Sequence, residues 1–282
     1  MKEITSPLEF KWMDSSAEAN LDNRFSFTID SRTKSQILKT SSLQKGMKLA
    51  CDGRELVDEG MGFGVPVIKY RNGMYYSKDA MMIRINKKNV VGKNFRMDSL
   101  ERIRIGKLGK IEFPSPALRF LAFAYRSSNF LGKRMTQVDQ ALRKRAEIET
   151  EFVAVKNRGD VSMTYEINSH RIHVKCDLTR LEKDALQKIF ILNEQGSCFF
   201  RQYSDTDGVH LARGEIGAWK RVKAERACFS DPKSTFAFCL NGLEGIAMWR
   251  GREDHADLRW SGLVYESGPN TDIIDYDILL RY

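Results

Sequence analysis

The chain has 282 residues, of which 42% are hydrophobic and 29% are charged, as in an ordinary globular protein. This length exceeds a typical single domain, although large all-β domains reach it. The first residues carry an acid and a proline where a signal peptide has an apolar run, and no later apolar run approaches the ~20 residues that span a bilayer. We therefore expect a cytoplasmic protein with no membrane segment.

The formal net charge of +9 is concentrated in one part of the sequence. Residues 69–110 contain 12 Lys and Arg against 3 Asp and Glu, a local excess of 12 − 3 = 9. A concentrated basic surface attracts anionic partners such as nucleic acid or an acidic polysaccharide. A solvated surface without a partner remains an equal alternative.

The cysteine count is odd, and no two cysteines have C-x-x-C spacing. This pattern argues against a disulfide framework and against a zinc ribbon. Several of the cysteines stand within apolar alternation, so we expect all five to be reduced core residues: Cys51, Cys176, Cys198, Cys228 and Cys239.

The N-terminal third predicts a series of short strands. Residues 1–24 are polar and are expected to form an irregular segment, after which Phe25–Ile29 alternates with period two. Residues 47–51 form the next strand candidate. The following stretch, 58–66, has three alternate glycines and leads into the β-branched segment Val65–Ile68, which excludes a dinucleotide-binding turn because that turn must open a helix. Alternate glycines in a strand indicate a bulge or a close approach by another backbone or a ligand.

Two hairpins are predicted next. Residues 67–76 form the first, with Asn72-Gly73 providing the positive φ angles of a type I′ turn, and residues 81–91 form the second. Residues 100–105 alternate charge with isoleucine, as an amphipathic strand does. Short strands at this spacing favour an all-β sandwich or barrel.

The central region contains the helix candidates. We expect a helix or buried strand at 115–125, a surface helix at 136–145 and a strand at 147–155. A turn at 157–160 precedes a hairpin between 161–167 and 172–178. The residues Thr179 to Glu182 match a capping box and predict a short helix.

The last third adds further strands at 189–192, 198–203, 235–240, 246–249 and 258–265. The fold class that follows is all-β, a predominantly antiparallel β-sandwich with a few short helices. We expect one such domain over residues 25–282.

A resemblance to a known fold family rests on this rhythm of strands over residues 60–282. The hairpin that ends in Asp177-Leu178-Thr179, with Trp249-Arg250-Gly251-Arg252-Glu253 and Trp260-Ser261-Gly262-Leu263 after it, resembles the β-supersandwich of galactose-mutarotase-like proteins. That fold also occurs in domains of polysaccharide lyases and glycoside hydrolases. Mutarotases are expected to use a histidine pair and a glutamate. That set does not map onto His170, His173, His210 or His255, so the resemblance transfers no catalytic role.

Carboxylates and aromatic residues provide the candidate site. Asp58, Glu59, Glu194 and Glu253 lie beside glycines or in expected loops, where site residues concentrate, and glycoside chemistry uses a pair of carboxylates. We select Glu59, Glu194 and Glu253 as candidate acids or bases. Aromatic faces stack on sugars and arginines bind anionic groups, so the candidate substrate-binding residues are Trp249, Arg250, Arg252, Trp260 and Tyr265. The alternative for the tryptophans is a place in the core.

The sequence leaves three functions open. The first is carbohydrate binding or processing, as an epimerase, lyase or glycoside hydrolase if the protein is an enzyme. The second is nucleic-acid binding through the basic 69–110 region with Tyr70, Tyr75 and Tyr76. The third is a structural or interaction protein. No cofactor and no metal site are predicted, because the carboxylates around His255 lack a recognised ligand spacing.

Overall fold

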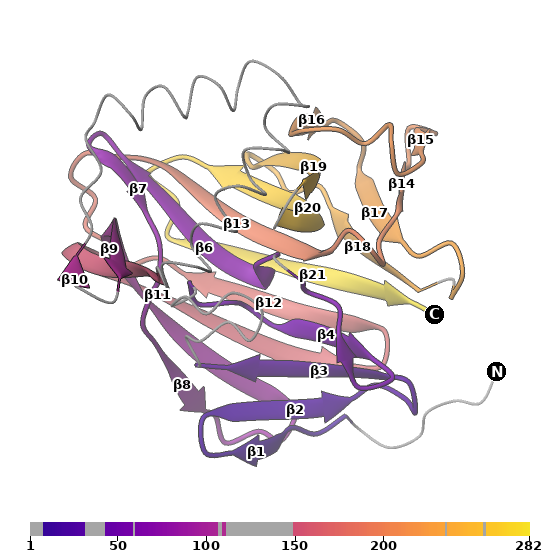
Figure 1. Ribbon diagram of the computed structural model, residues 1–282. Coiled ribbons are helices and arrows are strands. Elements are labelled where there is room, and N and C mark those ends of the chain that lie inside the picture. The colour runs from indigo at the N-terminus through magenta and orange to yellow at the C-terminus, as the bar shows by residue number, and fades with distance from the viewer. Residues whose placement is uncertain are drawn as a thin grey trace. The chain divides into compact units, whose positions relative to one another are not determined.

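The computed structural model describes residues 8–31, 43–58, 60–106, 109–110, 149–234, 236–255 and 258–282 (Figure 1). The chain divides into two compact units, one of residues 1–32, 43–99 and 156–282 and the other of residues 33–42 and 100–155. The residues of the candidate site described below lie in the first unit, whereas β10 and parts of β9 and β11 belong to the second. The single domain expected over 25–282 stays a prediction.

The described residues form three antiparallel sheets and contain no helix. The five-stranded sheet has the order β1-β2-β3-β4-β5, formed by Lys11–Met13, Ser16–Asn20, Phe25–Asp30, Lys48–Cys51 and Arg54–Glu55. The six-stranded sheet has the order β16-β19-β20-β13-β6-β7, formed by Lys220–Val222, Ala247–His255, Leu258–Ser267, Leu186–Gly196, Gly62–Tyr70 and Gly73–Tyr75.

The ten-stranded sheet follows the path β10-β9-β11-β12-β21-β18-β17-β14-β15, and β8 also pairs with β9. In that path the strands are Gly109–Lys110, Val90–Gly106, Glu149–Asn168, Arg171–Asp177, Ile273–Arg281, Ala237–Asn241, Arg226–Ser230, Gln202–Asp205 and His210–Leu211, with β8 at Ala80–Arg84. The expected antiparallel β-sandwich is thereby confirmed.

The core includes residues of all three sheets, and one part of it lies between the six-stranded and ten-stranded sheets. The phenol of Tyr276 (β21) donates to Asn193 Oδ1 (β13) at 2.9 Å, and the ring of Phe63 (β6) lies 5.0 Å from that of Phe238 (β18). Tyr165 (β11) donates to the carbonyl of Gly64 at 2.8 Å. A Cβ on Gly64 would lie 2.8 Å from this hydroxyl, so the expected close approach at the alternate glycines is present.

Strand β13 is central in the six-stranded sheet, between β6 and β20 (Figure 1). Its residues alternate between two faces, and Asn193 points into the shared core. Glu194 therefore points to the opposite face, which we call the Glu194 face. The register of β13 with β6 shifts between Leu192 and Asn193, which confirms the expected bulge beside the glycines.

The predicted hairpins are confirmed, but one turn differs from the expectation. Tyr70 pairs with Gly73 in the first hairpin, and β8 pairs with the start of β9 in the second. Of the two residues predicted to have positive φ, Gly73 does (145°) and Asn72 does not, so the turn is not type I′. The hairpin between β11 and β12 is also confirmed.

Several local expectations are wrong. The segment expected to be irregular contains β1 and β2, which pair with each other. Residues 157–160 do not end a strand, because β11 continues through Gly159 with a φ of 99°. No helix follows Thr179: its hydroxyl donates to Asp177 instead, a local bond that competes with helix formation. A strand was expected at 198–203, but β14 begins only at Gln202, so residues 198–200 precede it. The expected helices at 115–125 and 136–145 lie outside the described residues.

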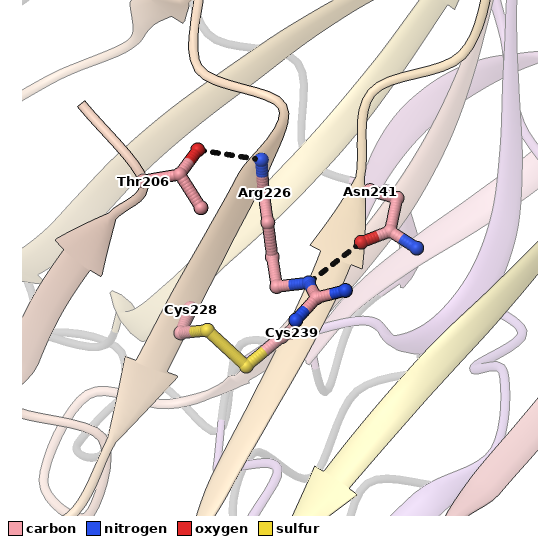
Figure 2. Close-up of a disulfide and its surroundings, with 5 residues drawn as sticks. All are labelled: Thr206, Arg226, Cys228, Cys239 and Asn241. Carbon is pink, nitrogen blue, oxygen red and sulfur yellow. Dashed lines mark hydrogen bonds between the residues drawn. A yellow bond between two sulfur atoms is a disulfide. The ribbon is translucent and has the colours of Figure 1, made fainter.

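The expectation that all cysteines are reduced is also wrong. Cys228 and Cys239 form a disulfide between β17 and β18, where they are directly opposed in register (Figure 2). Arg226 Nε donates to Asn241 Oδ1 at 2.8 Å beside it. The sequence did not reveal this pair, because the register of the two strands, and not a recognised spacing of the cysteines, brings the thiols together. The cytoplasmic location stays a prediction, although such disulfides are rare in a reducing compartment.

Candidate functional site on the six-stranded sheet

A row of glycines surrounds Glu194 across the six-stranded sheet. Glu194 pairs with Gly62 of β6 on one side and with Gly262 of β20 on the other, and Gly262 pairs with Gly251 of β19. Directly opposed residues of antiparallel strands point to the same face. We call these four residues the Glu194 row. Glu194 is the one residue of this row that is not a glycine.

Neighbouring side chains occupy the space that the glycines leave. A Cβ on Gly262 would lie 2.9 Å from Cγ of Glu194, and a Cβ on Gly251 would lie 2.7 Å from Cε3 of Trp219. The carboxylate side chain therefore lies against one glycine and the Trp219 indole against another. Larger residues at either position would displace these groups from the sheet.

The carboxyl group of Glu194 is buried without an opposing charge in direct contact among the described residues. Its Oε2 accepts a hydrogen bond from Met61 N at 3.3 Å. Burial raises the pKa of Glu194 from its ordinary 4.5 to about 7, although the Met61 hydrogen bond and the charge of Lys45 lower it in part. A carboxyl that exchanges its proton near neutral pH is suited to general acid–base catalysis.

A second carboxylate lies on the same face. Asp58 Oδ2 is 2.7 Å from the position that a Cβ on Gly196 would occupy, and Gly196 is two residues from Glu194 along β13. Same-face positions of a strand are about 7 Å apart. Lys45 Nζ donates to the carbonyl of Asp58 at 2.8 Å and thereby holds this loop. Asp58 was named among the loop carboxylates but not selected, because nothing in a sequence shows which carboxylates meet.

An aromatic pair adjoins the carboxylates. Trp260 pairs with Gly196, so it points to the Glu194 face, and its ring stacks on that of Trp219 at 4.6 Å between centroids and 20° between planes. The side chain of Trp219 is 40% exposed. An exposed, anchored indole provides a flat apolar surface of the kind that sugar rings stack on. Sequence analysis did not select Trp219, since it lies outside the strand motifs.

The candidate residues from the sequence divide between the two faces of the sheet. Glu194, Glu253, Trp249 and Trp260 share the Glu194 face, because Glu253 pairs with Trp260 and Trp249 is two residues from Gly251. The indole nitrogen of Trp249 is buried and has no hydrogen-bond partner among the described residues. Glu59 lies outside the described residues.

The remaining candidates, Arg250, Arg252 and Tyr265, point to the other face. The Arg250 guanidinium lies 4.7 Å from the centroid of the Tyr203 ring and donates to the carbonyl of Ile216 at 2.8 Å. Arg252 forms an ion pair with Asp254, and Tyr265 is buried in the core. The two arginines thus hold the segment that carries Trp219 rather than lie beside Glu194.

Three residues of the basic 69–110 region lie in the core. Tyr70 and Tyr75 are buried in the core, where their rings pack 4.8 Å apart, and so cannot stack on bases. Lys93 is fully buried, and its Nζ donates to the backbone carbonyls of Asp30 and Lys45. These residues contribute to the fold.

Metal ligands do not gather in the described part of the chain, where no group of three or more His, Cys, Asp or Glu is placed to hold an ion. His173 lies between Asp275 and Asp277, at 3.2 and 3.0 Å, on strands β12 and β21. No helix among the described residues is long and apolar enough to cross a membrane.

The fold and the site together define an antiparallel β-sandwich with a buried glutamate and a tryptophan stack on one sheet. No protein-family model and no curated protein matches the chain. Among solved structures, it is similar to the α-N-acetylgalactosaminidase NagBb from Bifidobacterium bifidum in complex with GalNAc, with 8% identity and a TM-score of 0.42 over 96% of this chain and 35% of that one.

Two further structures are similar to the chain over nearly their whole lengths. The Slr1438 protein from Synechocystis sp. PCC 6803 has 9% identity and a TM-score of 0.36, covering 100% of this chain and 99% of that one. HI1317 has 9% identity and a TM-score of 0.38, covering 100% and 98%. At such values these likenesses carry no argument about the site.

Proposed function

We propose that the protein binds a carbohydrate on the Glu194 face and moves a proton on it through Glu194. The observation that carries this proposal is the buried carboxyl of Glu194, with its pKa raised to about 7, in a row of glycines beside an exposed tryptophan stack. Sugar sites combine an aromatic surface with a few placed polar groups.

The division of roles follows from the surroundings of each group. Glu194 exchanges the proton, since its pKa lies near neutral pH. Asp58 is the second carboxylate, at the neighbouring position of the same face. Glycoside chemistry uses two carboxyl groups, one that protonates a sugar oxygen and one that accepts a proton or attacks. Trp219 provides the stacking surface.

Binding is tested first, by titrating the intact protein with galactose and with N-acetylgalactosamine and following tryptophan fluorescence at low and high salt. We expect saturable binding that persists at high salt, because stacking and neutral hydrogen bonds are weakly screened. Trp219→Ala should weaken binding about tenfold with little loss of stability, since this side chain is 40% exposed. Trp12→Ala, in β1, is the matched control. Equal binding by both variants would remove Trp219 from the site.

Catalysis is tested by polarimetry of freshly dissolved α-galactose and by hydrolysis of aryl glycosides. Glu194→Gln keeps the size of the side chain and removes its titration, so we expect at least a hundredfold loss of activity with binding retained. Asp58→Asn should likewise lose activity and retain sugar binding. A protein that binds sugar but has no activity in either assay would retain the binding function alone.

A further inference from the structure

A cavity of about 740 Å³ opens at the other end of the six-stranded sheet, where β13 begins and β20 ends. Its volume is that of a small-molecule site. It is lined by parts of β13, β16, β19 and β20 and by the turns beside them, including Lys188, Arg221, Lys223, Ala247, Glu266 and Ser267.

The charges around this cavity are mainly positive. Lys188, Arg221 and Lys223 contribute three cations against the one carboxylate of Glu266, with which Lys188 forms an ion pair. Arg221 pairs with Trp249 and so points to the Glu194 face, and Lys223 follows two residues later. Arg221 in β16 and Lys223 directly after this strand therefore both line the cavity, and neither forms an ion pair with Glu266 among the described residues.

The side chain at the floor of the cavity is small, so it leaves room between the charged groups. Ala247 pairs with Glu266, and its methyl group stands where longer side chains would close the space. A Cβ on Gly245 or Gly268 would have no atom within 4 Å, so the turns that border the cavity are also open. A ligand can approach both side chains and backbone here.

One polar group of the lining has an unmet hydrogen bond. Ser267 is 4% exposed, and its Oγ has no hydrogen-bond partner among the described residues. A buried hydroxyl without a partner costs free energy, so its neighbours normally include an acceptor or a water. Ser267 pairs with Ile189, which points into the core, so its hydroxyl lies on the face opposite to Arg221 and is not a partner for a ligand held there.

We propose that this cavity binds a small ligand through an oxyanion group, a phosphate, with Arg221 and Lys223 as its partners. Arginine matches the geometry of a phosphate through paired N–H groups, and a lysine adds a point charge. The proposal does not depend on carbohydrate binding at Glu194, because no residue is common to the two sites.

The test uses two probes, inorganic phosphate and 2-glycerophosphate, titrated by calorimetry into the intact protein at constant ionic strength. We expect saturable binding to one or both. Tighter binding of the ester assigns the site to a phosphate on a larger molecule, and tighter binding of the free ion assigns it to inorganic phosphate.

Three variants locate the binding. Lys223→Gln should weaken it about tenfold, the value of one charge-assisted contact. Ala247→Leu keeps every charge but fills the cavity, and should abolish binding. Lys87→Gln removes an exposed lysine from the β8–β9 turn and should change nothing. Absence of saturable binding, or equal weakening by Lys223→Gln and Lys87→Gln, would overturn the proposal, since general attraction of anions would then explain the data.

Discussion

At the scale of single residues, the surroundings of Glu194 determine what the site can do. A carboxyl that is buried among glycines and receives one backbone hydrogen bond is protonated more readily than an exposed one. The same glutamate on an open strand position would be charged throughout the neutral range. The proposed function therefore depends on glycines, which carry no functional group themselves.

The raised pKa also predicts how stability depends on pH. Between the unfolded pKa of 4.5 and the folded pKa of about 7, the folded state holds a proton that the unfolded state has released. The contribution of protonated Glu194 is therefore complete below pH 4.5 and is lost as the pH rises through about 7. A shift of this size corresponds to a free energy on the order of 3 kcal/mol.

Glu194→Gln should remove this dependence. Urea unfolding at pH 5 and pH 8 should show the variant gaining stability relative to the natural protein as the pH rises. Glu244→Gln, which changes an exposed carboxylate, should follow the natural protein. An identical pH profile for all three proteins would mean that Glu194 titrates like an exposed glutamate.

At the scale of elements, strand register assembles the site. Gly262 is required because a Cβ there would lie 2.4 Å from the carbonyl oxygen of Asn193 and 2.9 Å from Cγ of Glu194. We expect Gly262→Ala to lower the free energy of unfolding by about 1–3 kcal/mol through overpacking. Gly268→Ala, where an added Cβ meets nothing within 4 Å, is the control. Equal thermal stability of the two variants would contradict the close packing of the Glu194 row.

The register of β17 and β18 also brings together the two cysteines of the disulfide. Replacing Cys228 and Cys239 together by serine should cost roughly 2–3 kcal/mol, because the disulfide closes a short loop of the unfolded chain. Thermal denaturation with and without a reducing agent measures this, and the double variant should not respond to the reductant. A natural protein that is equally stable in both conditions, with free thiols by mass spectrometry, would contradict the pairing.

The sequence predicted what depends on local pattern and missed what depends on pairing. Alternation located most strands, and Asn-Gly located a hairpin, although its turn type was wrong because φ is positive at Gly73 but not at Asn72. Glu194 was selected as a residue of an expected loop after the strand at 189–192, whereas it lies within β13. The division of Trp260 and Arg252 between two faces follows from register, and Trp219 reaches the site through a segment with no strand signal.

At the scale of the molecule, one sheet carries both proposed sites. The carboxylates and the tryptophan stack lie toward the end of β13, and the basic cavity lies where β13 begins. The interior face of the same sheet is occupied by core packing, such as the hydrogen bond from Tyr276 to Asn193. This division lets one face vary in chemistry while the other maintains the sandwich.

The roles proposed for Glu194, Asp58 and Trp219 all require that a carbohydrate binds on the Glu194 face. The most direct measurement is an NMR titration of the intact protein with galactose and N-acetylgalactosamine at high salt, following the indole N–H signals. We predict saturable shifts at Trp219 and Trp260 that Trp219→Ala weakens and Lys87→Gln leaves unchanged. Shifts absent from both indoles, or unaffected by Trp219→Ala, would contradict a carbohydrate site on this face.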